Sequence, residues 1–167
     1  KIKISDEKIF VKKSLNRISA KNLNSPVNYP AGNNSAFDGY AIRSNETVGL
    51  NKKNIKKFKI LKTLAAGDNP EIKNIRKFSS VEIMTGALIP KYFDTVIPIE
   101  EISFYPNKKK PKFILINKKI QKNKHVRFSG SDYKKGERVI SAGEMINSSH
   151  ILAFKSLGIK KINVKKK

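Results

Sequence analysis

Short apolar runs separated by turn residues recur from residue 40 to residue 120, and this spacing constrains the fold more than any other feature. Strands in such runs are bounded by Gly, Pro, Asn or Asp. Pro98 confines its own run to a sheet edge or a bulge, because proline cannot donate a ladder hydrogen bond. The spacing predicts a small all-β barrel or sandwich. The expected strands are Ile55–Leu64, Val81–Met84, Thr95–Ile99 and Phe113–Ile116.

The segments on either side of this region mix strand and helix signals. Residues 4–23 predict a brief strand that passes into a short helix. Near the C-terminus, Asn147 or Ser148 is suited to cap a helix, Gly158 is suited to end it, and a strand over residues 159–164 follows. The apolar stripe of this helix is Ile151, Leu152, Phe154 and Leu157. We therefore expect a mixed α/β chain that is rich in β-structure.

The chain is strongly basic, with 36 Lys+Arg against 13 Asp+Glu and a formal net charge of +23. A surplus of this size can indicate nucleic-acid binding. Lysine dominates it, however, and is spread along the chain together with many Ile and Asn, as codon bias on surface positions would produce. Arginine, the residue suited to bidentate phosphate contacts, is scarce. Nucleic acid is therefore not the expected partner, whereas a small anionic substrate would benefit from the positive field.

The absence of cysteine excludes disulfides and cysteine-ligated metals, and it is compatible with a reducing compartment. No apolar run approaches the ~18 residues that a membrane-spanning helix needs. The first residues also lack the apolar core of a signal peptide. We expect a cytoplasmic protein with no membrane partner. Because the chain begins without Met, we also expect it to start inside a longer protein.

The run Asn33–Ala41 is the least interchangeable stretch of the sequence, since small and polar residues lead directly into an apolar segment. In an extended chain, one face would carry Asn34, Ala36, Asp38 and Tyr40, and the other Asn33, Ser35 and Phe37. Ala36 would then leave space for a ligand beside Asp38. Gly39 can adopt a backbone conformation closed to other residues. The alternative is an ordinary Asn-rich turn in which Asp38 is a turn residue.

Two later loops also contain small and polar residues together with a glycine, namely Thr85–Pro90 and His125–Tyr133. Loops of this kind can converge at one end of a scaffold and form a site. The alternative is that all are ordinary turns.

If the loops do converge, their residue types suggest how an anionic ligand would be bound. Asp38 and Asp132 could hold Mg²⁺ together with waters, as metals shared with phosphates are often held. Thr85 and the backbone of Gly86 could donate hydrogen bonds to an oxyanion. Arg127 could clamp a phosphate or another oxyanion.

These loops carry a resemblance to a known family. Asn34–Ala41 resembles the DNSAMDGYA signature of the MoeA/gephyrin E-domain family, the molybdopterin molybdenumtransferases. Ile83–Ala87 followed by Pro90 is similar to that family's RIMTGAPLP. The other three similar segments, in family order, are Asp94–Ile97 running into Glu100, Val126–Arg127 through Gly130 and Asp132, and Gly136 through Ile159.

The chain also departs from the family pattern. Asn33 stands in place of the first Asp of DNSAMDGYA, and Phe37 stands in place of its Met. In the third loop, the family's Asn, two of its Arg and its Glu are replaced by His125, Phe128, Ser129 and Ser131. The third loop is therefore poorer in charge than its counterparts, which puts its share in ligand binding in question.

The resemblance implies a small β-barrel domain, residues 33–123, inserted into an elongated α/β domain formed by residues 1–32 and 124–167. It implies the N-terminal portion of a dimeric transferase that inserts molybdate into adenylylated molybdopterin and releases AMP with Mg²⁺. A molybdopterin adenylyltransferase is an expected protein partner. The domain that carries most of the substrate contacts is expected to follow residue 167, so this portion alone is expected to be inactive.

The resemblance also suggests roles for individual residues. Asp38 and Thr85 are the expected catalytic residues. Arg127, Ser35 and Gly86 are expected to bind substrate, and Asp38 with Asp132 to bind Mg²⁺. Two alternatives from other classes stay open: a basic β-barrel module that binds RNA or another polyanion, and a non-catalytic scaffold for dimerisation.

Overall fold

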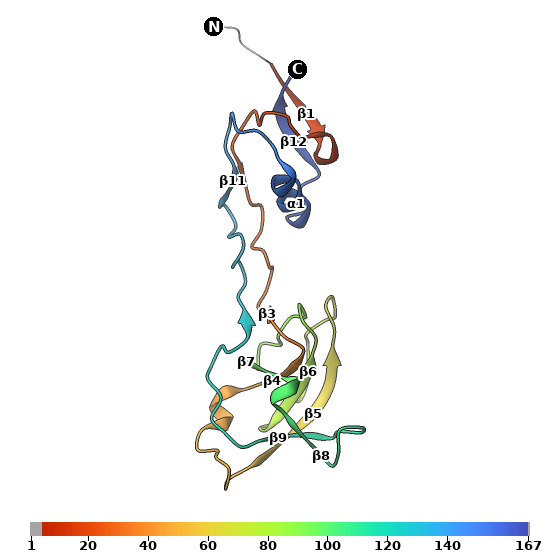
Figure 1. Cartoon of the computed structure of the whole chain (residues 1–167), viewed down its shortest axis with the longest axis vertical. Coiled ribbons are helices and arrows are strands. Elements are labelled where there is room, and N and C mark those ends of the chain that lie inside the picture. Colours follow the sequence, from red (N-terminus) through yellow and green to blue (C-terminus); the bar gives the residue numbers. More distant parts are fainter. Residues whose placement is uncertain (1–4, 167) are drawn as a thin grey trace. The chain divides into compact units, whose positions relative to one another are not determined.

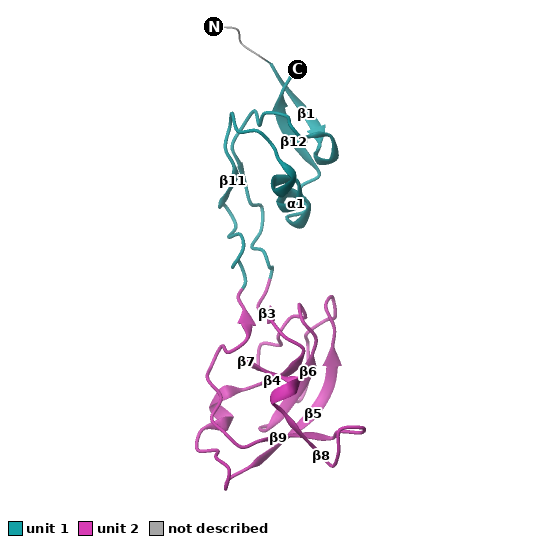
Figure 2. Ribbon diagram, viewed as in Figure 1, with its two compact units in different colours: residues 1–31, 129–167 teal, residues 32–128 magenta. Residues whose placement is uncertain are grey.

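The computed structural model describes residues 5–166, and the chain divides into two compact units (Figure 2). Unit 1 consists of Lys1–Ala31 and Ser129–Lys167, and unit 2 consists of Gly32–Phe128. Unit 1 is discontinuous because the chain leaves it, forms the whole of unit 2 and then returns. Within the described part of the chain, no helix has the length and apolar character needed to cross a membrane.

Unit 2 is built on a curled six-stranded sheet with the order β7-β4-β6-β5-β9-β8 (Figure 1). Only the β5–β6 pair is parallel, and its register shifts between Ile60 and Thr63. A separate two-stranded pair joins β3 to β10. The strands are β3 (Asn34–Ser35), β4 (Gly39–Ile42), β5 (Lys56–Leu64), β6 (Ser79–Ile83), β7 (Thr95–Pro98), β8 (Ser103–Tyr105), β9 (Phe113–Ile116) and β10 (Val126–Arg127), with 3₁₀ turns η2 (Ser44–Thr47) and η3 (Ile99–Glu101).

The apolar runs of the sequence supply the core of unit 2. β4 and β7 are buried throughout, whereas β5 and β9 alternate, with Phe58, Ile114 and Ile116 buried and their neighbours less so. One cluster gathers around Tyr40 and Phe58, and a second around Ile83 and other residues of β6. The predicted strands are confirmed. Pro98 does end an edge strand, since β7 is the first strand of the sheet order.

Unit 1 has a small core of its own, formed by one helix and two strand pairs. Its elements are β1 (Asp6–Phe10), η1 (Val11–Lys13), β2 (Leu23–Asn24), β11 (Arg138–Ile140), α1 (Ser148–Ser156) and β12 (Lys161–Lys165). β1 pairs with β12 and β2 with β11, both antiparallel. The cluster is Val11, Val139, Ile140, Ile146, Phe154, Leu157, Ile162 and Val164. Together the two units confirm a mixed, β-rich fold.

Two expectations for unit 1 need correction. The helix predicted within residues 4–23 is only the 3₁₀ turn η1, because Asn16 adopts a left-handed backbone conformation with φ 59° and the chain turns away. In α1, Leu152 is not part of the apolar stripe and is 68% exposed. Phe154 and Leu157, three positions apart, share the buried face, and Leu152 points away from it. Asn147 is the cap, since its side chain accepts the backbone N–H of His150 at 3.0 Å.

Candidate functional site

Asp38 and Thr85, the two residues expected to be catalytic, are directly bonded in unit 2. The carboxylate oxygen Oδ1 of Asp38 accepts the backbone N–H of Thr85 at 2.7 Å and its hydroxyl group at 2.7 Å. Both residues are exposed. Asp38 lies in the bend before β4, and Thr85 lies in the loop after β6. The structure therefore brings the first two predicted loops together at one carboxylate.

A tight turn presents Thr85 to Asp38. The N–H of Ala87 donates to the carbonyl of Met84 at 3.0 Å, which closes a four-residue turn with Thr85 and Gly86 at its centre. Gly86 has φ +82°, the left-handed value that a type II turn requires at its third residue. This is a position where glycine adopts a conformation that other residues avoid.

Backbone hydrogen bonds fasten this turn to the Asn33–Ala41 run. Gly86 N–H donates to the carbonyl of Ser35 at 2.9 Å, and Ser35 N–H donates to the carbonyl of Ala87 at 3.0 Å. Further along, Ile89 N–H donates to the carbonyl of Asn33 at 2.9 Å. The two loops thus form a short ladder of their own, and the Asp38–Thr85 contact lies at one end of it.

The Asn33–Ala41 run is not one extended segment, so the predicted alternation of faces is wrong. β3 ends at Ser35, whose hydroxyl group donates to the carbonyl of Phe37 at 2.5 Å, and this local bond turns the chain before β4 begins. The N–H of Ala36 donates to the carbonyl of His125 at 3.0 Å. The His125 ring meets the Phe37 ring edge-on, with centroids 4.7 Å apart. Two of the residues that depart from the family pattern therefore contact each other beside Asp38.

Gly39 is needed for space and not for an unusual backbone conformation, which corrects the expectation from the sequence. Its φ lies outside the left-handed region. A Cβ atom at this position would lie 2.1 Å from the carbonyl oxygen of Ile97. Glycine allows β4 to approach β7 closely, and this approach fixes the strand that follows Asp38.

The expected oxyanion donors are already engaged within the protein. Both donors of Thr85 bond to Asp38, and the N–H of Gly86 bonds to Ser35. In this structure the turn therefore offers no backbone N–H of Thr85 or Gly86 to an anion. It presents a carboxylate, and both donation by these groups to an oxyanion and substrate contact by Ser35 or Gly86 stay predictions.

The hydrogen bonds also set the charge of Asp38. The backbone N–H of Thr85, and then its hydroxyl group, hold the pKa of the Asp38 carboxyl group below its ordinary value. Asp38 would be anionic at neutral pH even at its ordinary pKa of 3.8, and these hydrogen bonds favour the anion further. Its second oxygen, Oδ2, accepts no hydrogen bond from the described residues, so one oxygen of a fixed, exposed carboxylate is open to a ligand.

The other two predicted site residues fall in different units. Arg127 belongs to β10 in unit 2, is exposed and lies opposite Asn34 of β3. Asp132 belongs to unit 1, where its N–H donates to the carbonyl of Tyr29 at 3.0 Å. Within residues 5–166, no three His, Cys, Asp or Glu side chains form a cluster able to hold a metal. A shared role of Asp38 and Asp132 stays a prediction.

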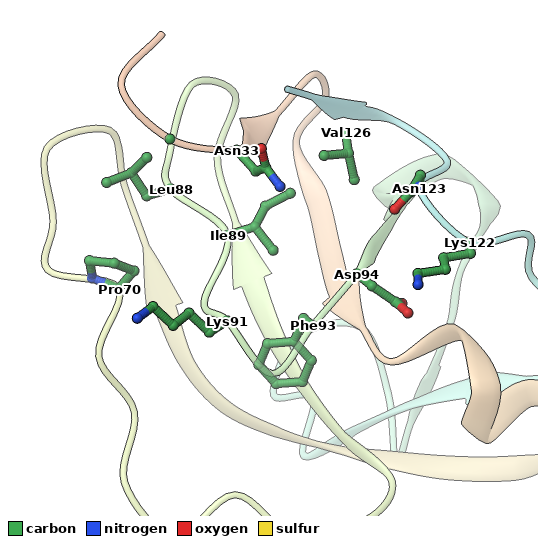
Figure 3. A pocket seen from close by; sticks show the side chains of 11 residues that line it. Asn33, Pro70, Leu88, Ile89, Lys91, Phe93, Asp94, Lys122, Asn123 and Val126 are labelled. Atoms are coloured by element: carbon green, nitrogen blue, oxygen red, sulfur yellow. The ribbon is translucent and has the colours of Figure 1, made fainter. Parts of the chain in front are cut away.

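A groove of about 540 Å³ opens at the other end of the ladder (Figure 3). Leu88, Ile89, Phe93 and Val126 give it an apolar lining, and Lys91 and Lys122 also line it. No local pattern predicted this groove, because its lining comes from segments far apart in the chain.

Comparison with known proteins shows which family the chain matches. The model of a family described as the MoeA N-terminal region, domains I and II, matches residues 1–158. The chain is 34% identical over 158 residues to a Methanocaldococcus jannaschii protein named for molybdopterin biosynthesis. It is 30% identical over 156 residues to a molybdopterin molybdenumtransferase of Staphylococcus aureus. These alignments cover 95% and 93% of this chain and 36% of each relative.

A solved structure agrees with these relatives. A molybdopterin biosynthesis MoeA protein from Pyrococcus horikosii matches with a TM-score of 0.90 and 29% sequence identity. The match covers 100% of this chain and 41% of that chain. The chain thus spans little more than a third of the length of the curated relatives it matches. Fold, family model and relatives agree, and the chain belongs to the MoeA family as its N-terminal region, domains I and II.

Proposed function

We propose that this chain forms the first two domains of a molybdopterin molybdenumtransferase, which inserts molybdate into adenylylated molybdopterin and releases AMP. Membership of the MoeA family and the names of the relatives support this proposal. Because the chain spans only 36% of those relatives, the remaining substrate contacts belong to residues outside it. The chain alone is accordingly expected to show no molybdenum insertion.

The observation that carries the proposal is the bonded pair of Asp38 and Thr85. Two short hydrogen bonds to a single oxygen fix the carboxylate and keep it anionic. The open oxygen Oδ2 is suited to accept a hydrogen bond from a water or to ligate a hydrated cation. Thr85 holds the carboxylate in place and, through its hydroxyl oxygen, can accept one further hydrogen bond.

The residues present fit a weakly held Mg²⁺ and do not fit a metal enclosed by protein ligands. Mg²⁺ in enzymes of phosphate chemistry commonly keeps several waters and is held by one or two carboxylates together with substrate phosphates. Asp38 can supply such a carboxylate. When bound, the ion would neutralise negative charge on phosphate oxygens.

The other parts of the proposal rest on the family. Arg127 is exposed and is proposed to neutralise substrate charge, and Asp132 to assist Mg²⁺ binding. The complete protein is proposed to be a cytoplasmic homodimer that receives its substrate from a molybdopterin adenylyltransferase. Light scattering of the complete protein measures the dimer, and a pull-down with the adenylyltransferase tests the partner.

The central test uses the complete enzyme with Asp38→Asn, which removes the charge and keeps the shape. Molybdenum insertion and AMP release should both fall at least a hundredfold, a size common for the loss of one catalytic group. Glu71→Gln is the matched control, because Glu71 is an exposed carboxylate of the same unit. Full activity of Asp38→Asn would contradict the catalytic role and favour a scaffold for dimerisation.

A second pair of variants tests the role of Thr85. Thr85→Val removes the hydroxyl donor to Asp38, whereas Thr85→Ser keeps it. If Thr85 acts by fixing Asp38, Thr85→Val should lower activity and raise the Mg²⁺ concentration needed for half-maximal rate, and Thr85→Ser should restore both. Equal loss in the two variants would instead point to packing of the threonine methyl group.

A further inference from the structure

Two segments of unit 2 carry many basic residues and no acidic residue. Residues 47–67 carry six lysines, and residues 102–128 carry eight lysines and one arginine, with no Asp or Glu in either. These segments supply fifteen of the 36 Lys and Arg residues of the chain. Codon bias alone would spread lysine evenly along the chain. Whether the charge of these two segments is functional therefore depends on where the fold places them.

The fold joins the two segments in one sheet. β5 lies in the first segment and β8 and β9 lie in the second, and β9 pairs with both (Figure 1). In the register, Lys59 lies opposite Phe113, which lies opposite Tyr105. The sheet therefore places acid-free sequence from two distant parts of unit 2 side by side.

One face of these three strands is open, and we call it the β5–β9–β8 face. Phe58, Ile114 and Ile116 turn inward and belong to the core. The alternate residues turn outward. They are Lys57, Lys59, Ser103, Tyr105, Phe113 and Leu115, of which the two lysines, Ser103 and Tyr105 are exposed and the other two half-buried.

Two neighbouring aromatic rings on this face have lysines beside them. The Nζ of Lys57 lies 3.4 Å from the centroid of the Tyr105 ring. The rings of Tyr105 and Phe113 lie 6.3 Å apart. Among the described residues, neither Lys57 nor Lys59 forms an ion pair, so the protein does not neutralise their charges.

The loop between β8 and β9 extends the positive charge. It carries Lys108, Lys109, Lys110 and Lys112. Its backbone is turned by Asn107, whose Oδ1 accepts the N–H groups of Lys109 and Lys110, both at 3.0 Å. A local turn therefore holds this lysine loop at one end of the face.

We propose that the β5–β9–β8 face binds single-stranded RNA, a function separate from molybdenum insertion. Unpaired lysines attract the phosphates, and the exposed ring of Tyr105 beside Phe113 provides a surface on which a base can stack. An acidic peptide would use the lysines and leave the rings without a role. A duplex would hide its bases from them, so the combination favours a single strand.

The test measures binding of a fluorescent uridine oligonucleotide of about twelve residues to the 167-residue chain over a series of salt concentrations. Lys57→Gln with Lys59→Gln removes two charges from the face. Lys73→Gln with Lys77→Gln is the matched control, since both lysines are exposed in the same unit outside the acid-free segments. Circular dichroism melting confirms that each variant is folded.

We expect the double variant Lys57→Gln, Lys59→Gln to reduce the slope of log affinity against log salt concentration by about 1.4, at about 0.7 for each lost phosphate contact. The control should leave that slope unchanged. Equal losses in the two variants would show attraction by net charge alone and would overturn the proposal. Absence of salt-dependent binding would overturn it as well.

Tyr105 separates stacking from simple charge attraction. Tyr105→Ala should weaken oligonucleotide binding about fivefold or more, and Tyr105→Phe should preserve it because the ring is kept. Inorganic polyphosphate and duplex RNA are the comparison probes. If Tyr105→Ala has no effect, or if either probe binds as tightly as the single strand, the face is not a single-strand site.

Discussion

One carboxylate lies within the β4–β6 pair and another lies beside it, and each accepts a hydrogen bond from a threonine hydroxyl group. Glu82 uses both oxygens: Oε1 accepts the Tyr40 hydroxyl group at 3.3 Å, and Oε2 accepts that of Thr63 at 2.6 Å. Asp38 uses one oxygen, for both donors of Thr85. Glu82 lies opposite Tyr40 within the strand pair, whereas Asp38 lies in the bend before it.

The difference separates a structural carboxylate from one that is available for chemistry. Glu82 ties three strands together, since Tyr40, Glu82 and Thr63 belong to β4, β6 and β5. Each of its oxygens accepts a hydrogen bond from a side chain of the protein. Asp38 accepts two hydrogen bonds at Oδ1 and none from the described residues at Oδ2, so a hydrogen-bonded carboxylate keeps one oxygen for a ligand. The predictions below test this contrast.

Gly39→Ala should have the largest effect, because Gly39 follows Asp38 and begins β4, the strand that places Tyr40 opposite Glu82. The added Cβ would meet the carbonyl oxygen of Ile97 at 2.1 Å and would force β4 away from β7. We expect the free energy of unfolding in urea to fall by about 3 kcal/mol. Gly67→Ala is the control: Gly67 has open space and φ +94°, so only backbone strain of about 1 kcal/mol is expected. Equal losses would show that space at Gly39 is unimportant.

Glu82→Ala should destabilise the chain more than Asp38→Ala does. Removing Glu82 leaves the buried hydroxyl group of Tyr40 without its acceptor, a loss of about 2 kcal/mol. Asp38 is exposed, and water can replace it as a partner for Thr85. Urea unfolding of the two variants measures the difference. A larger decrease in the free energy of unfolding for Asp38→Ala than for Glu82→Ala would mean that Asp38 is the structural carboxylate.

Alkaline pH should reveal how much the hydrogen bond between Tyr40 and Glu82 contributes to stability. Burial, followed by the negative charge of Glu82, raises the pKa of Tyr40 to about 12 from its ordinary 10.0. Because the folded pKa is raised, this contribution to stability is complete below pH 10 and is lost as the pH rises toward 12. The free energy of unfolding should decrease across that window, and the decrease should be smaller in Tyr40→Phe. If the free energy of unfolding decreases equally in Tyr40→Phe, the decrease comes from other titrating groups.

Local patterns predicted the strands of unit 2 well, because alternation and turn residues act over a few positions. The position of Thr85 in a glycine-containing turn also follows from local chemistry. The family resemblance pointed to Asp38 and Thr85 as functional residues. Nothing local, however, indicated that these two residues bond across 47 positions of sequence.

The predictions that failed depended on distant parts of the chain. The reason for Gly39 is the carbonyl of Ile97, a contact that only the pairing of β4 with β7 creates. The lysines appeared evenly spread in the sequence, and only the β5–β9 pairing gathers them. Conversely, the helix expected in residues 4–23 failed because Asn16 turns the chain after a single turn.

The smallest effect should come from acid pH and concerns Asp38 itself. Its hydrogen bonds with Thr85 hold its pKa below the ordinary 3.8, so its contribution to stability is present above that value and is lost as the pH falls through the lower, folded pKa. NMR titration of the Asp38 carboxyl carbon should show this lowered pKa. Thr85→Val removes the hydroxyl donor and keeps the backbone N–H, the stronger of the two causes, so the pKa should rise only part of the way. Thr85→Ser should leave it unchanged. A complete return to the ordinary value in Thr85→Val would show that the hydroxyl group, and not the turn that presents the N–H, fixes the charge of Asp38.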